Sequence, residues 1–170
     1  MKRSIMIVAA AAIAAACGPK GDAEMGKTGA AASVIPKPNA ATVTSEQFAA
    51  LKWIDGYWRG AAPDGPPFYE RYVFADDSTI SMYAFSDSTF SASNDSAHIT
   101  LRNGVVRDAG KTASWVATRV DSAAVDFEPE WGATNTFTWA RDGDSWTATI
   151  QSGSGASKAV AVYRMRRVNR

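Results

Sequence analysis

From residue 54 to the end of the chain, short runs of β-branched and aromatic residues alternate with turn sequences. Asp76-Asp77-Ser78, Arg102-Asn103-Gly104 and Asp142-Gly143-Asp144 carry the Asp, Asn and Gly residues that favour tight hairpin turns. No segment of this part sustains the three-to-four-residue spacing of apolar side chains that predicts a helix. Because strands joined by tight turns pair antiparallel, the sequence predicts an all-β domain in meander order.

Eleven runs bounded by turn signals qualify as candidate strands. They are residues 54–60, 68–75, 80–86, 89–92, 98–101, 105–108, 112–120, 123–127, 136–141, 145–151 and 159–168. The chain's 170 residues are too few for two ordinary domains. A single domain over residues 44–170 with this many short strands suits an antiparallel up-and-down barrel or a strongly curled sheet.

One short helix is expected ahead of the strands. Thr44 and Gln47 have the spacing of a capping box, in which each side chain bonds the other residue's backbone amide. Val43 and Phe48 occupy the positions of a hydrophobic staple around the same helix start. These signals predict a helix over residues 45–52.

The first residues have the features of a secretion signal. Lys2 and Arg3 precede an apolar run over residues 5–16, which is too short to span a membrane and typical of a signal peptide. The sequence Ala14-Ala15-Ala16-Cys17 resembles the lipobox of bacterial lipoproteins, although Ala14 stands where Leu is usual. The resemblance implies cleavage after residue 16 and lipidation of Cys17. The alternative is an ordinary secretory signal that leaves Cys17 a free thiol.

Residues 17–43 are expected to form a flexible tether between the lipidated cysteine and the barrel. The segment is rich in Gly, Ala, Pro and Lys, with few apolar residues from which to build a core. An ordered strand over residues 32–35 is the alternative. Gly18 follows the cysteine and no Asp stands at that position, which in a Gram-negative host implies the outer membrane, facing the periplasm.

Composition excludes several classes of function. The formal net charge is +1, so the chain lacks the basic excess that nucleic-acid binding requires. It contains one Cys and one His, too few for a disulfide framework, a structural zinc site or an iron–sulfur centre. We therefore expect no metal, no other cofactor and no nucleic-acid partner; the oligomeric state is not predictable from the sequence.

Strand alternation places arginines in register with large aromatic residues. Trp115 shares a strand face with Arg119, and Trp139 shares one with Arg141. One interpretation is that the arginine stems cover apolar surface while their guanidinium groups reach water. The other is that the arginines point into a barrel lumen and pair with an anionic ligand.

Gly56-Tyr57-Trp58 lies just after the predicted helix and opens the first strand. It resembles the Gly-x-Trp motif of the calycin superfamily, the lipocalins and their relatives. The resemblance implies that Trp58 packs across the closed end of a barrel and that an arginine of a late strand, Arg164 or Arg166, covers it through a cation–π contact.

Longer stretches carry a second resemblance. Residues 53–60, 69–72 and 137–148 are similar to an uncharacterised bacterial group of lipocalin-like secreted proteins. Where that group tends to have His-Asp-Phe-Pro, this chain has Glu130-Trp131-Gly132. A related branch of small barrels binds haem through a histidine near the C-terminal end, but the single histidine of this chain, His98, lies mid-chain.

Signals for catalysis are weak. His98 beside Ser96 or Asp95 has the chemistry of a general base, but a solvated turn histidine explains it more simply. Acidic residues around Pro129 meet one requirement of glycoside hydrolysis, yet charged loops are usually just solvated. The loop over residues 152–156 resembles a phosphate cradle only superficially, because a strand rather than a helix follows it. The sequence predicts a protein that is not an enzyme.

Two functions are therefore expected. In the first, the barrel binds a small hydrophobic or amphipathic ligand, with Arg119 or Arg141 orienting a carboxylate on it. The candidate lining residues are Tyr72, Phe74, Met82, Phe85, Trp115, Arg119, Trp139, Arg141 and Trp146. In the second, the barrel is filled and serves as a structural or protein-interaction module of the cell envelope.

The arginines of the last strand have two interpretations of their own. The cluster comprises Arg164, Arg166, Arg167 and Arg170. It has the charge to contact anionic lipid headgroups. Alternatively, it discourages pairing at an exposed sheet edge.

Overall fold

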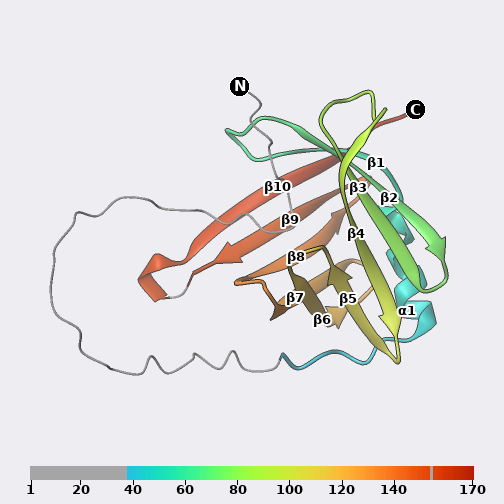
Figure 1. The fold of residues 1–170 in the computed structure, drawn as a ribbon, viewed down its shortest axis with the longest axis vertical. Helices are drawn as coiled ribbons and strands as arrows, with labels where there is room; N and C mark the ends of the chain where they lie inside the picture. The colour runs from blue at the N-terminus through green and yellow to red at the C-terminus, as the bar shows by residue number, and fades with distance from the viewer. Residues whose placement is uncertain (1–37, 154) are drawn as a thin grey trace, which may run out of the picture.

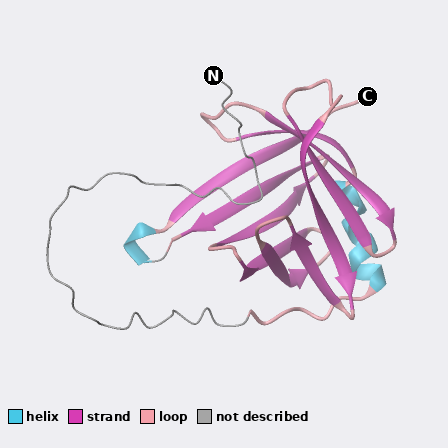
Figure 2. Cartoon of the chain, viewed as in Figure 1, coloured by secondary structure: helices cyan, strands magenta, loops and turns pink. Residues whose placement is uncertain are grey.

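The computed structural model describes residues 38–153 and 155–170, and in these residues ten antiparallel strands close into one barrel (Figure 1). The strands are β1 (Gly56–Ala61), β2 (Phe68–Asp76), β3 (Thr79–Phe85), β4 (Ser93–Arg102), β5 (Val105–Ala109), β6 (Ser114–Val120), β7 (Ala124–Trp131), β8 (Asn135–Asp142), β9 (Ser145–Ser152) and β10 (Ala159–Arg167). Within the described residues, helical turns are confined to α1 (Ser45–Ala49), η1 (Ala50–Ile54) and η2 (Gly155–Ser157) (Figure 2).

The topology is up-and-down: each strand pairs with the one before it, and β10 returns to pair with β1. The predicted fold class, an all-β antiparallel up-and-down barrel with a short N-terminal helix, is confirmed. The predicted strand over residues 89–92 is wrong, because these residues form part of the loop between β3 and β4. Phe90 in that loop has a φ of 51°, a left-handed conformation incompatible with a strand.

The helical segment covers one end of the barrel. The capping box is present as predicted: the Gln47 amide donates to Thr44 Oγ1 over 3.2 Å, and the Thr44 amide donates to Gln47 Oε1 over 2.9 Å. Phe48 is fully buried and contacts Phe74 near the β2–β3 turn, with ring centroids 5.9 Å apart. We call this end of the barrel the helix end.

The chain joins the barrel slightly before the helix. The Ala41 amide donates to the Ala117 carbonyl over 2.9 Å, and the Val43 amide donates to the Gly104 carbonyl over 2.8 Å. Residues 41–43, which the sequence analysis assigned to the tether, thus pack against the barrel. The predicted signal peptide, Cys17 and the predicted tether up to residue 37 lie outside the described residues.

Aromatic rings fill the interior toward the helix end. Trp146 is 1% exposed, and its ring lies 5.9 Å from that of Trp58, 5.7 Å from that of Tyr72 and 5.6 Å from that of Trp139. Tyr72 on β2 also contacts Trp139 on β8, with ring centroids 5.8 Å apart. β2 and β8 are not adjacent in the barrel, and neither are β1 and β9, which carry Trp58 and Trp146, so these rings meet across the lumen and form a packed core there.

A cation–π contact anchors the junction of β1, β10 and η1. The Arg167 guanidinium lies 4.4 Å from the centre of the Trp58 ring and donates to the carbonyls of Asp55 and Trp53. Gly56 has a φ of 125°, and a side chain there would collide with the Arg167 guanidinium.

The arginine that covers Trp58 differs from the one predicted from the sequence. Trp58 occupies the predicted place, but Arg167 covers it rather than Arg164 or Arg166. Met165 is buried on β10, and alternation puts Arg167 on the same strand face, over Trp58, while Arg164 and Arg166 point outward.

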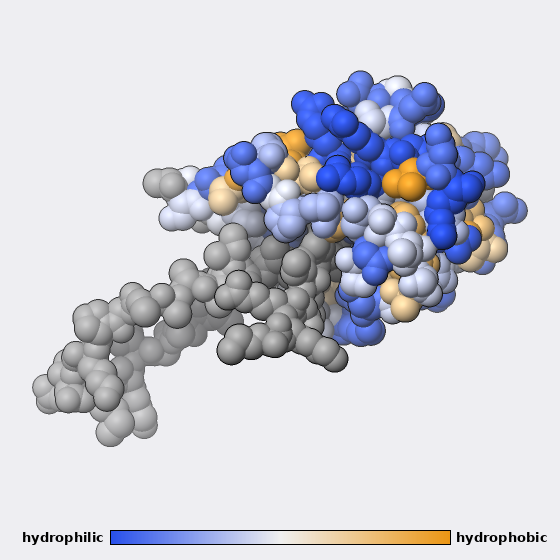
Figure 3. All heavy atoms as spheres, turned by 90° about the horizontal axis from the view of Figure 1, so that it is seen from above, coloured by the Kyte–Doolittle hydropathy of each residue, from blue (hydrophilic) through white to orange (hydrophobic). Residues whose placement is uncertain are grey.

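The face seen in Figure 3 is largely hydrophilic, with small hydrophobic areas among strongly hydrophilic residues. Within residues 38–153 and 155–170, no helix has the length and apolar character needed to cross a membrane.

Replacing Arg167 tests the closing contact. We expect Arg167→Ala to lower the free energy of unfolding by about 1–2 kcal/mol, because it removes a cation–π contact and two charge-assisted hydrogen bonds. The neighbouring Arg166→Ala removes the same charge from the outer face and should change the free energy of unfolding by less than about 0.5 kcal/mol. Urea denaturation followed by tryptophan fluorescence measures both, and equal effects would contradict the assignment.

Candidate functional site

Two carboxyl groups lie inside the barrel. Glu70 on β2 is 2% exposed, and Asp108 on β5 is 7% exposed. Alternation explains both positions: Phe68, Glu70 and Tyr72 share the inward face of β2, and Asp108 shares the inward face of β5 with Val106. Acids are almost never buried without partners, so these two are the strongest functional candidates in the described part of the chain.

The hydrogen bonding of the pair is incomplete. The Tyr72 hydroxyl donates to Glu70 Oε2 over 2.9 Å. Glu70 Oε1 and Asp108 Oδ1 are buried and have no hydrogen-bond partner among the described residues. The indole N–H of Trp146, whose ring contacts Tyr72, is also buried without a partner. The lumen therefore contains unused hydrogen-bonding groups on a small set of connected side chains, which we call the buried acid site: Glu70, Tyr72, Asp108 and Trp146.

Burial controls the ionisation of this site. Desolvation raises the pKa of Glu70 to about 8, although the bond from Tyr72 opposes the shift and the nearby charge of Asp108 adds to it. Desolvation likewise raises the pKa of Asp108 to about 7. The pKa of Tyr72 is raised well above its usual value by burial and by the neighbouring acids. Near neutral pH the site thus holds protons that exposed carboxyl groups would have lost.

The structure brings together most of the predicted lining residues. Six of them face inward: Tyr72, Phe74, Met82, Trp115, Trp139 and Trp146. Glu70 and Asp108 were not predicted from the sequence. The available signal was an acid in the inward phase of a predicted strand, as Glu70 is between Phe68 and Tyr72. No sequence pattern predicts that Glu70 and Asp108 lie close together, because β2 and β5 are separated by two other strands in the sheet.

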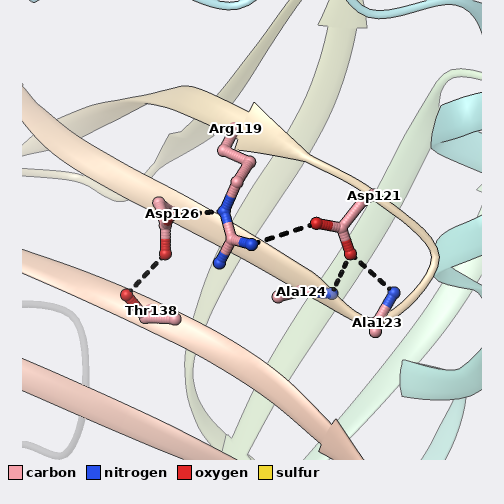
Figure 4. A network of polar contacts seen from close by, with 6 residues as sticks. All are labelled: Arg119, Asp121, Ala123, Ala124, Asp126 and Thr138. Carbon is pink, nitrogen blue, oxygen red and sulfur yellow. Dashed lines mark hydrogen bonds and ion pairs between the residues drawn. The ribbon is translucent and has the colours of Figure 1, made fainter.

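Arg119, a predicted lining residue, is on the outer wall instead. Its side chain is 52% exposed and forms ion pairs with Asp126 at 2.6 Å and Asp121 at 3.1 Å (Figure 4). The register shifts between Ala117 and Arg119, which turns the arginine outward beside Asp126 on β7. A guanidinium held by two surface carboxylates is not positioned to bind a ligand in the lumen.

Arg141 and Phe85, which were also predicted to line the lumen, do not lie in it. Arg141 is exposed, and its Nε donates to the Gly143 carbonyl in the β8–β9 turn. Phe85 lies one residue after the inward-facing Ala84 and therefore points outward, where its ring contacts Phe90 at 5.1 Å. With Arg119 and Arg141 outside, neither arginine expected to bind a carboxylate lies in the lumen.

The other polar groups considered for catalysis do not form a site. His98 Nδ1 is 3.3 Å from Ser81 Oγ, and within the described residues no hydrogen bond joins it to Ser96 or Asp95, the partners considered from the sequence. Glu130 forms an ion pair with Arg107 at 2.9 Å, as Asp126 does with Arg119. In the part of the chain that the structure describes, no three His, Cys, Asp or Glu side chains are grouped as metal ligands.

Comparison with known proteins gives no match to this chain, whether with family models, curated proteins or solved structures. The chemistry of the buried acid site is therefore the basis for a functional proposal.

The raised pKa values predict a pH-dependent stability. Each acid binds its proton more tightly in the folded protein than in the unfolded chain, so folding is favoured at low pH and this contribution is lost as pH rises. We expect the free energy of unfolding to fall between pH 5 and pH 8, through the pKa values of about 7 for Asp108 and about 8 for Glu70. Urea denaturation at several pH values measures this slope.

Glu70→Gln should remove a large part of that slope, because glutamine does not ionise. The matched control is Glu128→Gln on the exposed outer face of β7, which should leave the slope unchanged. A wild-type stability that rises over this range, or equal slopes in Glu70→Gln and wild type, would contradict the assignment.

Proposed function

We propose that this protein is a non-enzymatic binding protein of the cell envelope, whose barrel holds a small amphipathic molecule with a cationic, hydrogen-bond-donating head group. The head group binds between Glu70 and Asp108, and the apolar part contacts the aromatic side chains of the lumen. The polarity of this ligand is opposite to the anionic ligand expected from the sequence.

The observation that carries the proposal is the pair of unpartnered carboxyl oxygens inside the barrel. A buried acceptor without a donor costs about 1–3 kcal/mol, so a bound donor would offset a cost that the protein otherwise bears. An ammonium group supplies several donors and a positive charge, which favours the ionised form of both acids. Aromatic faces beside the acids add attraction for the same cation.

The envelope location rests on the sequence. The lipobox-like residues before Cys17 support a lipid anchor, and the Gly18 that follows supports the outer membrane, facing the periplasm.

Gly56, Trp58 and Arg167 meet in the way that the lipocalin-like resemblance implies, which supports membership of that superfamily.

A second candidate function is a structural or protein-interaction module with a filled barrel. It is favoured by the ring contacts among Tyr72, Trp139 and Trp146, which occupy the lumen near the helix end. The two candidates differ in whether a ligand can bind next to Glu70 and Asp108.

Three probes with eight carbon atoms each and different head groups distinguish these functions. Octylammonium, octanol and octanoate are titrated against the protein at pH 6 and pH 8, with binding followed by tryptophan fluorescence and calorimetry. We expect octylammonium to bind most tightly, more so at pH 8 than at pH 6 because the acids must lose their protons, and octanoate to bind most weakly.

The variant Asp108→Asn should weaken octylammonium binding at least about tenfold, whereas Asp126→Asn on the outer wall should not change it. Binding of none of the three probes would favour the filled module. Preferential binding of octanoate would contradict the proposed head-group chemistry.

A further inference from the structure

The outward face of β10 combines apolar and basic side chains in one line. Val160 is 57% exposed and Val162 is 38% exposed, and they are two of the three large hydrophobic residues exposed in the described part of the chain. Arg164 and Arg166 continue the same face toward the helix end and are also exposed. Arg59 on β1 lies opposite Arg166 in the register. We call these five residues the β10 face.

The arginines of this face are not used in ion pairs. Among residues 38–153 and 155–170, the ion pairs involve Arg107, Lys111 and Arg119, all on other strands or loops. Arg59 and Arg166 are instead directly opposite each other. Like charges opposite each other on neighbouring strands destabilise a sheet, so this pair lowers stability unless an anion lies between them.

Protection of a sheet edge does not explain these charges. Edge strands carry charged residues because their free amide and carbonyl groups invite pairing with other chains. In this barrel β10 pairs with β9 along its length and with β1 from Arg164 to Arg167, so its charged half has no open edge. The arginines lie where the strand is paired on both sides.

We propose that the β10 face docks on an anionic lipid surface. Guanidinium groups bind phosphate oxygens through paired hydrogen bonds, which matches Arg59, Arg164 and Arg166 to phospholipid headgroups. The two valines next to them enter the apolar boundary below the headgroups, a contact that a soluble polyanion would not offer. Charge complementarity and the adjoining apolar residues together favour a membrane over a nucleic acid, and the inference is independent of any ligand in the lumen.

The experiment measures vesicle binding by the chain from residue 18 onward, which contains every strand of the barrel and lacks the cysteine. Cosedimentation is compared between vesicles of phosphatidylglycerol with phosphatidylethanolamine and vesicles of phosphatidylcholine alone. We expect binding to the anionic vesicles only, and a decrease as salt is added. Equal binding to both kinds of vesicle, or to neither, would overturn the proposal.

Matched double variants locate the surface. Each arginine near an anionic membrane raises the partition coefficient about fivefold, so Arg164→Gln/Arg166→Gln should lower it about 25-fold. The control Arg102→Gln/Arg141→Gln removes the same charge from exposed arginines at the β4–β5 and β8–β9 turns and should have a much smaller effect. Equal losses in the two variants would mean that only net charge matters and would overturn the proposal.

The valines separate a membrane from other anionic partners. Val160→Ser/Val162→Ser should weaken vesicle binding, most clearly at high salt where the charge contribution is screened. Unchanged binding of this variant, together with full displacement from vesicles by a single-stranded RNA homopolymer, would point to a soluble polyanion and overturn the proposal. Circular dichroism of each variant checks that the barrel remains folded.

Discussion

The pairing of β10 with β1 is the constraint on which the rest of this structure depends. Closure gives every strand a defined inside and outside, so that a shift of one residue changes which side chains share the lumen. It places Trp58 under Arg167, and it leaves Arg164 and Arg166 on a wall with no free edge. The same closure takes Glu70 and Asp108 out of water, although they lie on strands that are not neighbours.

The interior contains two kinds of environment. Toward the helix end, Trp58, Trp139 and Trp146 pack in edge-to-face contacts like an ordinary protein core. Beside them, Glu70 and Asp108 keep carboxyl oxygens without partners. A chain selected only for a filled barrel would gain stability by replacing these acids with apolar side chains, because burying an unpaired acid is costly. Their presence is the physical reason for proposing a ligand.

Local patterns predicted most of the fold. The alternation of strands and turns and the capping box at Thr44 depend on neighbouring residues, which a sequence shows directly, whereas the packing of Trp58 at a barrel end was implied by the resemblance of Gly56-Tyr57-Trp58 to the Gly-x-Trp motif. Phe90 was not predictable in this way. It lies in a run with strand propensity, but its ring packs against Tyr57 and Tyr69 on the outer wall, with a left-handed backbone.

The candidate site was predicted less well, because it depends on long-range geometry. The sequence identified Tyr72, Trp139 and Trp146 as inward residues. It did not show that Arg119 turns outward at a register shift, or that barrel curvature brings the charge of Asp108 close enough to act on Glu70. For that reason the ligand that we propose has the opposite polarity to the one expected from the sequence.

The most direct test of the account is a carbon-13 NMR titration of the Glu70 and Asp108 side-chain carboxyl groups, assigned with Glu70→Gln and Asp108→Asn. We predict that the pair titrates near neutral pH, with a pKa of about 8 for Glu70 and about 7 for Asp108 instead of the usual 4.5 and 3.8. Titration of both groups at their usual values would show that they are in contact with water, and would contradict a closed lumen containing two buried acids.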